Sequence, residues 1–136
     1  EANGFIPSFH GINLKPGRPT MVGRMSKTLV ISLPGNPMAA FLNTYLFAIP
    51  ALKALVGHQR PMHPLYSAIN QKAFSLKSGR NNVILGYFEE GRFTVTRDNK
   101  FGSGMLTPLM ESNAIVVSEI EKSSFGENER ISLIMM

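Results

Sequence analysis

Two proline–glycine loops, separated by a short β segment, constrain this chain more than any other feature. The first reads Lys15-Pro16-Gly17-Arg18-Pro19, and the second reads Leu33-Pro34-Gly35-Asn36-Pro37. Proline fixes one backbone torsion and glycine accepts the positive φ of a tight turn, so both sequences favour turns. Between them, residues 20–25 and 28–32 predict a β-hairpin around Ser26 and Lys27.

A helix is predicted directly after the second loop. Asn36 is a favourable N-cap, and Pro37 suits the first helical position, where its missing N–H costs nothing. Apolar side chains then recur on one helical face: Met38, Phe41, Leu42, Tyr45, Leu46 and Ile49. Pro50 is expected either to kink this helix or to start a second one that ends at Gly57. A strand, a glycine loop and a helix in that order direct backbone N–H groups outward, which suits an anion.

The chain changes character at residues 58–63. This polar, proline-containing stretch predicts a linker between residues 1–57 and residues 64–136. Beyond it, short strands are expected at residues 66–74, 81–88, 92–97, 114–118 and 131–135, with a short helix over 103–110 capped by Ser103. This spacing indicates a small β-barrel or sandwich. Before the first loop, residues 5–14 predict a strand whose core residues are Phe9, Ile12 and Leu14.

The charge is unevenly distributed. The net charge is +5, yet no Asp or Glu occurs between Ala2 and Phe88, a segment that holds nine of the 14 Lys and Arg residues. A cationic segment without carboxylates indicates an anionic ligand, although a solvated basic surface has the same composition. Nucleic acid is not favoured, because the sequence has neither a basic run nor an alternation of basic and aromatic residues.

Several chemistries are excluded or left without support. The chain has no cysteine, which removes disulfides and thiolate ligands and fits a reducing compartment. His10, His58 and His63 are expected to be structural or surface residues rather than metal ligands. The Gly102-Ser103-Gly104 triplet is too short for a nucleophile elbow. Magnesium requires carboxylates, which the basic segment lacks.

Segments for membranes or export are not expected. No apolar run reaches about 18 residues, and no basic region precedes an apolar core at the N-terminus. The chain begins with Glu1 rather than methionine, so we expect a piece of a longer protein. For the loop at Lys15 and Arg18, phosphate binding and an ordinary surface turn both fit the spacing. The same ambiguity applies to Gly35 and Asn36 at the helix start.

The two loops together resemble one family. Their sequences are similar to the Lys-Pro-Gly-Lys-Pro and Leu-Pro-Gly-Asn-Pro motifs of the molybdopterin molybdenumtransferases, which include MoeA and the gephyrin E domain. The order, the spacing and the following helix match as well. The resemblance implies an α+β fragment of two parts. Residues 1–57 would be the C-terminal part of the α/β, MogA-like molybdopterin-binding domain, and residues 64–136 the complete C-terminal β-barrel, domain IV.

The resemblance also implies a function. Family members insert molybdate into the dithiolene of adenylylated molybdopterin and release AMP, in a magnesium-dependent reaction, as cytoplasmic homodimers. Neither nucleic acid nor a membrane is an expected partner, and this piece alone is expected to be inactive. Lys15, Gly17 and Arg18 would bind phosphate or molybdate, with arginine in place of the family's second lysine. Pro34, Gly35 and Asn36 would shape the pocket floor, and Ser103 would face the cleft from the last domain.

One departure from the family pattern affects the expected site. The family often has arginine directly before the glycine that corresponds to Gly86, where this chain has Leu85. An aliphatic side chain cannot bind an oxyanion, so that contact is lost or supplied elsewhere, for example by Arg80. The acidic, metal-associated residues of the family lie upstream of this stretch. A non-catalytic anion- or partner-binding module that keeps the fold is therefore the alternative function.

Overall fold

The N-terminal part of the chain forms a three-stranded antiparallel sheet in the order β1-β3-β4. The computed structural model describes residues 3–102 and 104–136. The strands are β1 (Phe5–His10), β3 (Met21–Met25) and β4 (Thr28–Ser32). The predicted hairpin is confirmed, with Ser26 at φ 57° in its turn.

The strand predicted over residues 5–14 is two strands. Gly11 adopts a φ of 83°, and after it β2 (Leu14–Lys15) leaves the first sheet and pairs with the barrel. Positive φ is incompatible with an extended strand, so the pairing of β1 stops before this glycine. Leu14 is buried and Ile12 packs against the core, but Phe9, which was expected in the core, is 44% exposed.

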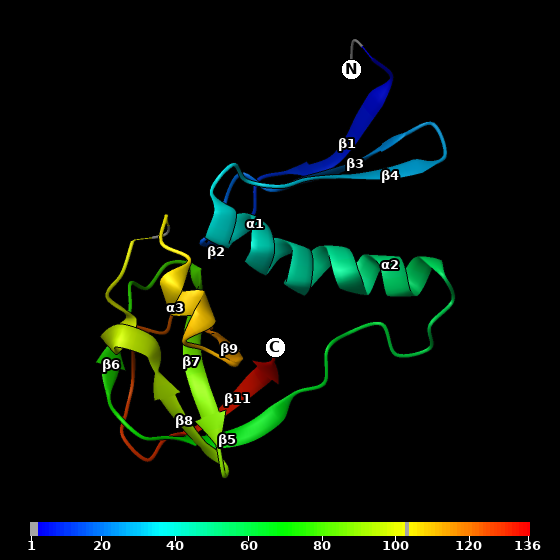
Figure 1. Ribbon diagram of the computed structural model, residues 1–136. Coiled ribbons are helices and arrows are strands. Elements are labelled where there is room, and N and C mark those ends of the chain that lie inside the picture. Colours follow the sequence, from blue (N-terminus) through cyan, green and yellow to red (C-terminus); the bar gives the residue numbers. More distant parts are fainter. Residues whose placement is uncertain (1–2, 103) are drawn as a thin grey trace.

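One continuous helix follows the second loop. It consists of α1 (Pro37–Asn43), a π-helical turn η1 (Thr44–Ala48) and α2 (Ile49–Leu55). The Asn36 side chain caps it by accepting from the Ala39 N–H at 3.1 Å. Pro50 neither breaks nor sharply kinks the helix (Figure 1). The Ile49 N–H donates to the Thr44 carbonyl, five residues back, and this wider turn accommodates a proline that has no N–H to donate.

The same helix corrects the expectation about apolar length. Its 19 residues, from Pro37 to Leu55, have a mean hydropathy of 1.4 and pass the length and composition test for a membrane span. Such a test is also met by core helices, and this helix buries Met38 and Leu42 against the barrel. Phe41, predicted on the buried face, is 45% exposed.

The C-terminal part is a closed five-stranded barrel. Its strands pair around the ring in the order β7-β8-β5-β11-β9 and back to β7 (Figure 1). All pairings are antiparallel except β5 with β8. The barrel strands are β5 (Tyr66–Asn70), β7 (Asn81–Glu89), β8 (Arg92–Val95), β9 (Ala114–Val117) and β11 (Arg130–Met135). A separate two-stranded sheet joins β6 (Phe74–Ser75) to β10 (Ser124–Phe125).

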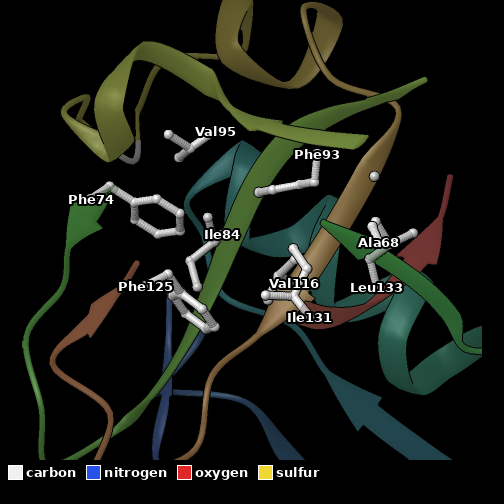
Figure 2. Close-up of a cluster of buried hydrophobic side chains, with 10 residues drawn as sticks. Ala68, Phe74, Ile84, Phe93, Val95, Val116, Phe125, Ile131 and Leu133 are labelled. Carbon is white, nitrogen blue, oxygen red and sulfur yellow. The ribbon is translucent and has the colours of Figure 1, made fainter. Parts of the chain in front are cut away.

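The barrel interior is one of two hydrophobic clusters. Phe74 and Phe125 stack at 5.2 Å between ring centroids at one end, and Phe93 is fully buried in the same core (Figure 2). A Cβ on Gly86 would lie 2.2 Å from the Phe93 ring, so glycine makes room for that ring. The buried members are Ala68, Phe74, Ile84, Phe93, Val95, Ala114, Val116, Phe125, Ile131 and Leu133.

The second cluster joins the helix to the outside of the barrel. Neighbouring β7 side chains point to opposite faces, so Ile84 lies inside the barrel while Val83 and Leu85 face the helix. Leu85 is 1% exposed and belongs to this cluster. The buried members are Leu14, Met38, Leu42, Val83, Leu85 and Ile115.

Three predictions for the C-terminal part need correction. The strand expected over residues 66–74 is split into β5 and β6. The strand expected over 92–97 ends at Val95, and a 3-10 turn η2 (Thr96–Asn99) follows. The short helix is α3 (Thr107–Met110), which begins after Leu106 without a side-chain cap. Ser103, its predicted cap, lies outside the described residues.

An ion pair joins the two segments that flank β10. The Glu129 carboxylate accepts from the Lys122 ammonium and from the Gly126 N–H, the latter at 2.7 Å. The Lys122 ammonium also lies 4.6 Å from the centre of the Phe125 ring. Both donors lower the pKa of Glu129, the Lys122 side chain more than the Gly126 amide.

Acid is therefore expected to weaken this ion pair. A carboxylate whose pKa is lower in the folded state stabilises the fold fully above the ordinary glutamate value, about 4.3, and loses that contribution as pH falls from there through the lower folded-state pKa. We expect Tm to fall between about pH 5 and pH 3, and to fall less in Glu129→Gln. Thermal melts across this range test it, with the exposed Glu127→Gln as control. A Glu129→Gln curve parallel to wild type would contradict this expectation. The pKa values of Asp98 and Glu111 are also lowered, so some slope remains in the variant.

Candidate functional site

A parallel strand pairing brings the first proline–glycine loop to the barrel. In β2, Leu14 and Lys15 pair with Asn81 and Asn82 at the start of β7. The pairing continues outward, since the Asn81 N–H donates to the Asn13 carbonyl at 2.9 Å. Lys15 therefore lies beside the loop that connects β6 to β7, although the two are more than 60 residues apart in sequence.

A cleft of about 780 Å³ opens along this junction. Its cations are Lys15 from the loop and Lys77 and Arg80 from the barrel, and none of its described lining residues carries a carboxylate. Its apolar wall belongs to the second hydrophobic cluster and to Phe101. The described lining residues are Lys15, Pro16, Met38, Leu42, Ser75, Leu76, Lys77, Arg80, Asn82, Val83, Leu85, Asn99, Phe101 and Gly102.

Asn82 organises the barrel side of the cleft. It is 6% exposed, and its side-chain amide donates to the Lys77 carbonyl at 2.9 Å and to the Arg80 carbonyl at 3.3 Å. Its side-chain oxygen accepts from Arg80 Nε at 3.3 Å. Ser118 Oγ accepts from the Asn82 backbone N–H at 2.9 Å, which fixes the asparagine to the next strand of the barrel. One buried side chain thus holds both ends of the loop that carries the two cations.

A second buried asparagine anchors the Lys15 loop to the helix. Asn43, in the last turn of α1, is fully buried and donates to Thr20 Oγ1 at 2.5 Å and to the Gly17 carbonyl at 3.3 Å. The Thr20 hydroxyl donates to the same carbonyl at 2.7 Å. Gly17 has a φ of 124°, and a Cβ there would lie 2.2 Å from Asn43 Nδ2. The loop that bears Lys15 is therefore fixed to the helix whose Met38 and Leu42 line the cleft.

The predicted site residues are distributed unequally around the cleft. Lys15 lines it, and Gly17 holds its loop in place. Arg18 is exposed and is not among the described lining residues. Pro34, Gly35 and Asn36 are also outside the lining, although Met38, one turn further on, belongs to it. Gly35 does not adopt the positive φ predicted for it. Ser103 lies outside the described residues, and its neighbour Gly102 lines the cleft.

Sequence reasoning from the loops did not place Lys77 or Asn82 in the site, and it named Arg80 only as a substitute contact. The sequence identified Lys77 and Arg80 only as two of the cations in the segment without carboxylates. Their position beside Lys15 follows from the pairing of β2 with β7, and such a short parallel pair has no signal in the sequence.

A left-handed turn shapes the barrel wall next to the cleft. Arg97, Asp98 and Asn99 all have φ between 51° and 59°, and Asn99 lines the cleft. Two ion pairs hold this turn: Arg97 with Glu111 at 2.6 Å and Lys72 with Asp98 at 2.7 Å. The Lys72 ammonium lowers the pKa of Asp98, and the Arg97 guanidinium lowers the pKa of Glu111. Asp98 and Glu111 are therefore each paired with a cation of the barrel part.

The described residues contain no cluster of metal-ligating side chains. Over residues 3–102 and 104–136, no group of three or more His, Asp or Glu side chains is placed to hold a metal ion. His63 instead stacks on Tyr45 at 4.2 Å between ring centroids, and its Nε2 lies 2.6 Å from the Tyr45 carbonyl. The Tyr45 hydroxyl donates to the Met135 carbonyl at 2.5 Å, and burial raises the pKa of Tyr45. His63 therefore ties the segment between helix and barrel to both.

The fold and the cleft define a class of protein: a strand–loop–helix unit joined to a five-stranded barrel, with a cationic cleft at the junction. Two family sequence models match these parts. Residues 67–135 match the family described as MoeA C-terminal region (domain IV), and residues 1–54 match the probable molybdopterin binding domain. The chain belongs to the MoeA family. The predicted fold class, an α/β domain end followed by a small β-barrel, is confirmed.

Curated relatives carry a consistent name. A molybdopterin molybdenumtransferase from Haemophilus influenzae is 27% identical over 130 residues, which cover 93% of this chain and 32% of the relative. Molybdopterin molybdenumtransferase 2 from Mycobacterium tuberculosis is 32% identical over 108 residues, which cover 79% of this chain and 27% of the relative. The chain thus spans about a third of the length of these relatives.

Solved structures show the same arrangement. The molybdopterin biosynthesis MoeA protein from Pyrococcus horikoshii is 31% identical with a TM-score of 0.79, and the match covers 96% of this chain and 32% of that one. A molybdenum cofactor biosynthesis protein from Pyrococcus furiosus is 26% identical with a TM-score of 0.84, covering 97% and 46%.

Proposed function

We propose that this chain is part of a molybdopterin molybdenumtransferase, which inserts molybdate into adenylylated molybdopterin and releases AMP. One observation carries the proposal: the two family-matched parts meet at a cleft with three cations and, among its described lining residues, no carboxylate. Adenylylated molybdopterin and molybdate are both anions, and such a cleft attracts anions without competition. The non-catalytic alternative is not favoured, because the relatives above are named as transferases.

The site of this proposal keeps the residues predicted from the loops. Lys15, which lines the cleft, is proposed as the anion-binding cation, and Gly17 as the residue that sets its loop. Arg18, Pro34, Gly35, Asn36 and Ser103 stay proposed binding residues, although Arg18 and residues 34–36 lie outside the described lining and Ser103 lies outside the described residues. The chain divides into residues 1–57 and 64–136, with residues 58–63 as the linker. The described lining of the cleft offers no carboxylate to Mg²⁺. Residues of the full-length protein outside this stretch are therefore proposed to hold the magnesium. The whole protein is proposed to act as a cytoplasmic homodimer, without a nucleic-acid or membrane partner.

Lys15→Ala is expected to weaken binding of phosphate, AMP or molybdate to this chain by about tenfold, which corresponds to about 1.4 kcal/mol. Wild-type affinity should also fall as salt rises, because part of the attraction is screened. Calorimetric titration measures both effects. Lys27→Ala, in the exposed β3–β4 turn, removes the same charge away from the cleft and is the control. Equal affinity in wild type and Lys15→Ala would make the loop an ordinary surface turn.

The reaction itself is tested in the full-length parent. AMP release from adenylylated molybdopterin, with molybdate and magnesium, is expected in the parent and should be strongly reduced by Lys15→Ala but not by Lys27→Ala. The 136-residue chain is expected to release no AMP, because the described lining of its cleft offers no carboxylate to hold magnesium. A parent that binds the substrate but releases no AMP would overturn the proposed reaction.

A further inference from the structure

The barrel part of the chain contributes two cations, Lys77 and Arg80, to the cleft. Arg80 directly precedes β7, and its Nε donates to Asn82 Oδ1 at 3.3 Å, so the two side chains are adjacent. Lys15 is the pairing partner of Asn82 on the adjacent strand, and paired residues share a face of the sheet. Backbone pairing therefore brings Lys15 to Asn82, the side-chain hydrogen bond brings Arg80 to Asn82, and all three residues line the cleft.

The Arg80 side chain is oriented by a buried group. Arg80 Nε donates to Asn82 Oδ1 at 3.3 Å, and Asn82 is fixed in turn by the loop carbonyls and by Ser118. No other described side-chain contact occupies the terminal guanidinium nitrogens of Arg80, and no carboxylate among the described lining residues competes for them. A guanidinium held through Nε presents its remaining N–H groups as a fork that matches two oxygens of a phosphate.

The cleft is larger than a single tetrahedral anion requires. Its volume of about 780 Å³ is that of a drug- or nucleotide-sized site, much more than a single tetrahedral anion needs. Its cations come from two segments, with Lys15 on one and Lys77 and Arg80 on the other, and its apolar wall offers a surface for a ring. Cations on two segments beside an apolar wall suit an elongated ligand with more than one phosphoryl group.

We propose that Lys77 and Arg80 bind a phosphoryl group of a diphosphate-containing ligand, with Asn82 as the positioning residue, while Lys15 binds another anionic group of the same ligand. The inference rests on the proposed function and deepens it by assigning barrel residues to substrate binding. Leu85 is buried in the second cluster and cannot take this role, so the cation of the barrel wall comes from the loop before β7.

Inorganic pyrophosphate and inorganic phosphate are the probes, titrated by calorimetry into the 136-residue chain. We expect wild type to bind pyrophosphate more tightly than phosphate. Arg80→Gln should weaken pyrophosphate binding by about tenfold, or about 1.4 kcal/mol, and Lys77→Gln should weaken it in the same direction. Arg80→Lys should lie between wild type and Arg80→Gln, since it keeps the charge but loses the fork. Arg60→Gln, an exposed cation in the linker, is the matched control.

An Arg80→Gln affinity equal to that of Arg60→Gln would overturn the assignment, because the effect would then be one of net charge. Undetectable pyrophosphate binding by wild type would overturn it too. Thermal melts of each variant verify folding, and the exposed Lys77 keeps the test valid if Arg80→Gln does not fold. AMP release by the parent is a separate readout. If the parent releases no AMP while pyrophosphate binding still depends on Arg80, the proposed reaction is wrong and the assignment of Arg80 is kept. If the parent releases AMP while pyrophosphate binding does not depend on Arg80, only the assignment of Arg80 is wrong.

Discussion

Leu85→Arg is expected to destabilise the chain by about 3–5 kcal/mol, the usual cost of an uncompensated buried charge. Leu85 is buried between the barrel strand β7 and helix α1, among Leu14, Met38 and Leu42. Leu85 also lines the cleft, which offers an arginine only like charges, since its described lining has three cations and no carboxylate. A loss of this size is a large share of a typical domain stability of about 5–15 kcal/mol.

Urea unfolding of wild type, Leu85→Arg and Leu85→Met measures this effect. Methionine conserves volume and should cost less than about 1.5 kcal/mol. The family often has arginine at this position, so one outcome would contradict the expectation. Unchanged stability together with tighter phosphate binding would mean that the new guanidinium reaches the cleft. Loss of stability in Leu85→Arg alone assigns the position to the core.

Gly17→Ala is expected to cost about 2–6 kcal/mol, since a strained φ and an overpacked contact each contribute about 1–3 kcal/mol. Gly17 has a φ of 124°, and a Cβ there would lie 2.2 Å from Asn43 Nδ2. Asn43 is fully buried and bonds both Thr20 and Gly17, so it cannot move without losing these hydrogen bonds. Anion affinity should fall as well, because Lys15 is two residues away on the same loop.

The second proline–glycine loop supplies the control. A Cβ on Gly35 meets nothing within 4 Å, and its φ lies outside the left-handed region. Gly35→Ala should therefore change the free energy of unfolding by less than about 1 kcal/mol. The two variants are compared by chemical denaturation and by phosphate titration. Similar losses in both would show that the Asn43 contact does not distinguish the two loops.

Local patterns in the sequence were sufficient for much of the fold. The Ser26 hairpin and the helix start at Asn36 were predicted because turns and caps depend on adjacent residues. The strands β9 and β11 followed from β-branched and alternating residues. Phe9 and Phe41 were predicted to be buried but are exposed, because apolar periodicity identifies a face without saying what covers it.

For the candidate site, the sequence by itself determined the two proline–glycine loops, the absence of carboxylates between Ala2 and Phe88, and the family resemblance they carry. Only the tertiary structure decided which cations share a cleft, because β2 pairs with β7 through backbone groups that every residue type possesses. That pairing places Lys15 beside Asn82 and leaves Arg18 outside the described lining. The tertiary structure also decided that Leu85 is buried, because alternation along β7 directs Leu85 to the helix and Ile84 to the barrel interior.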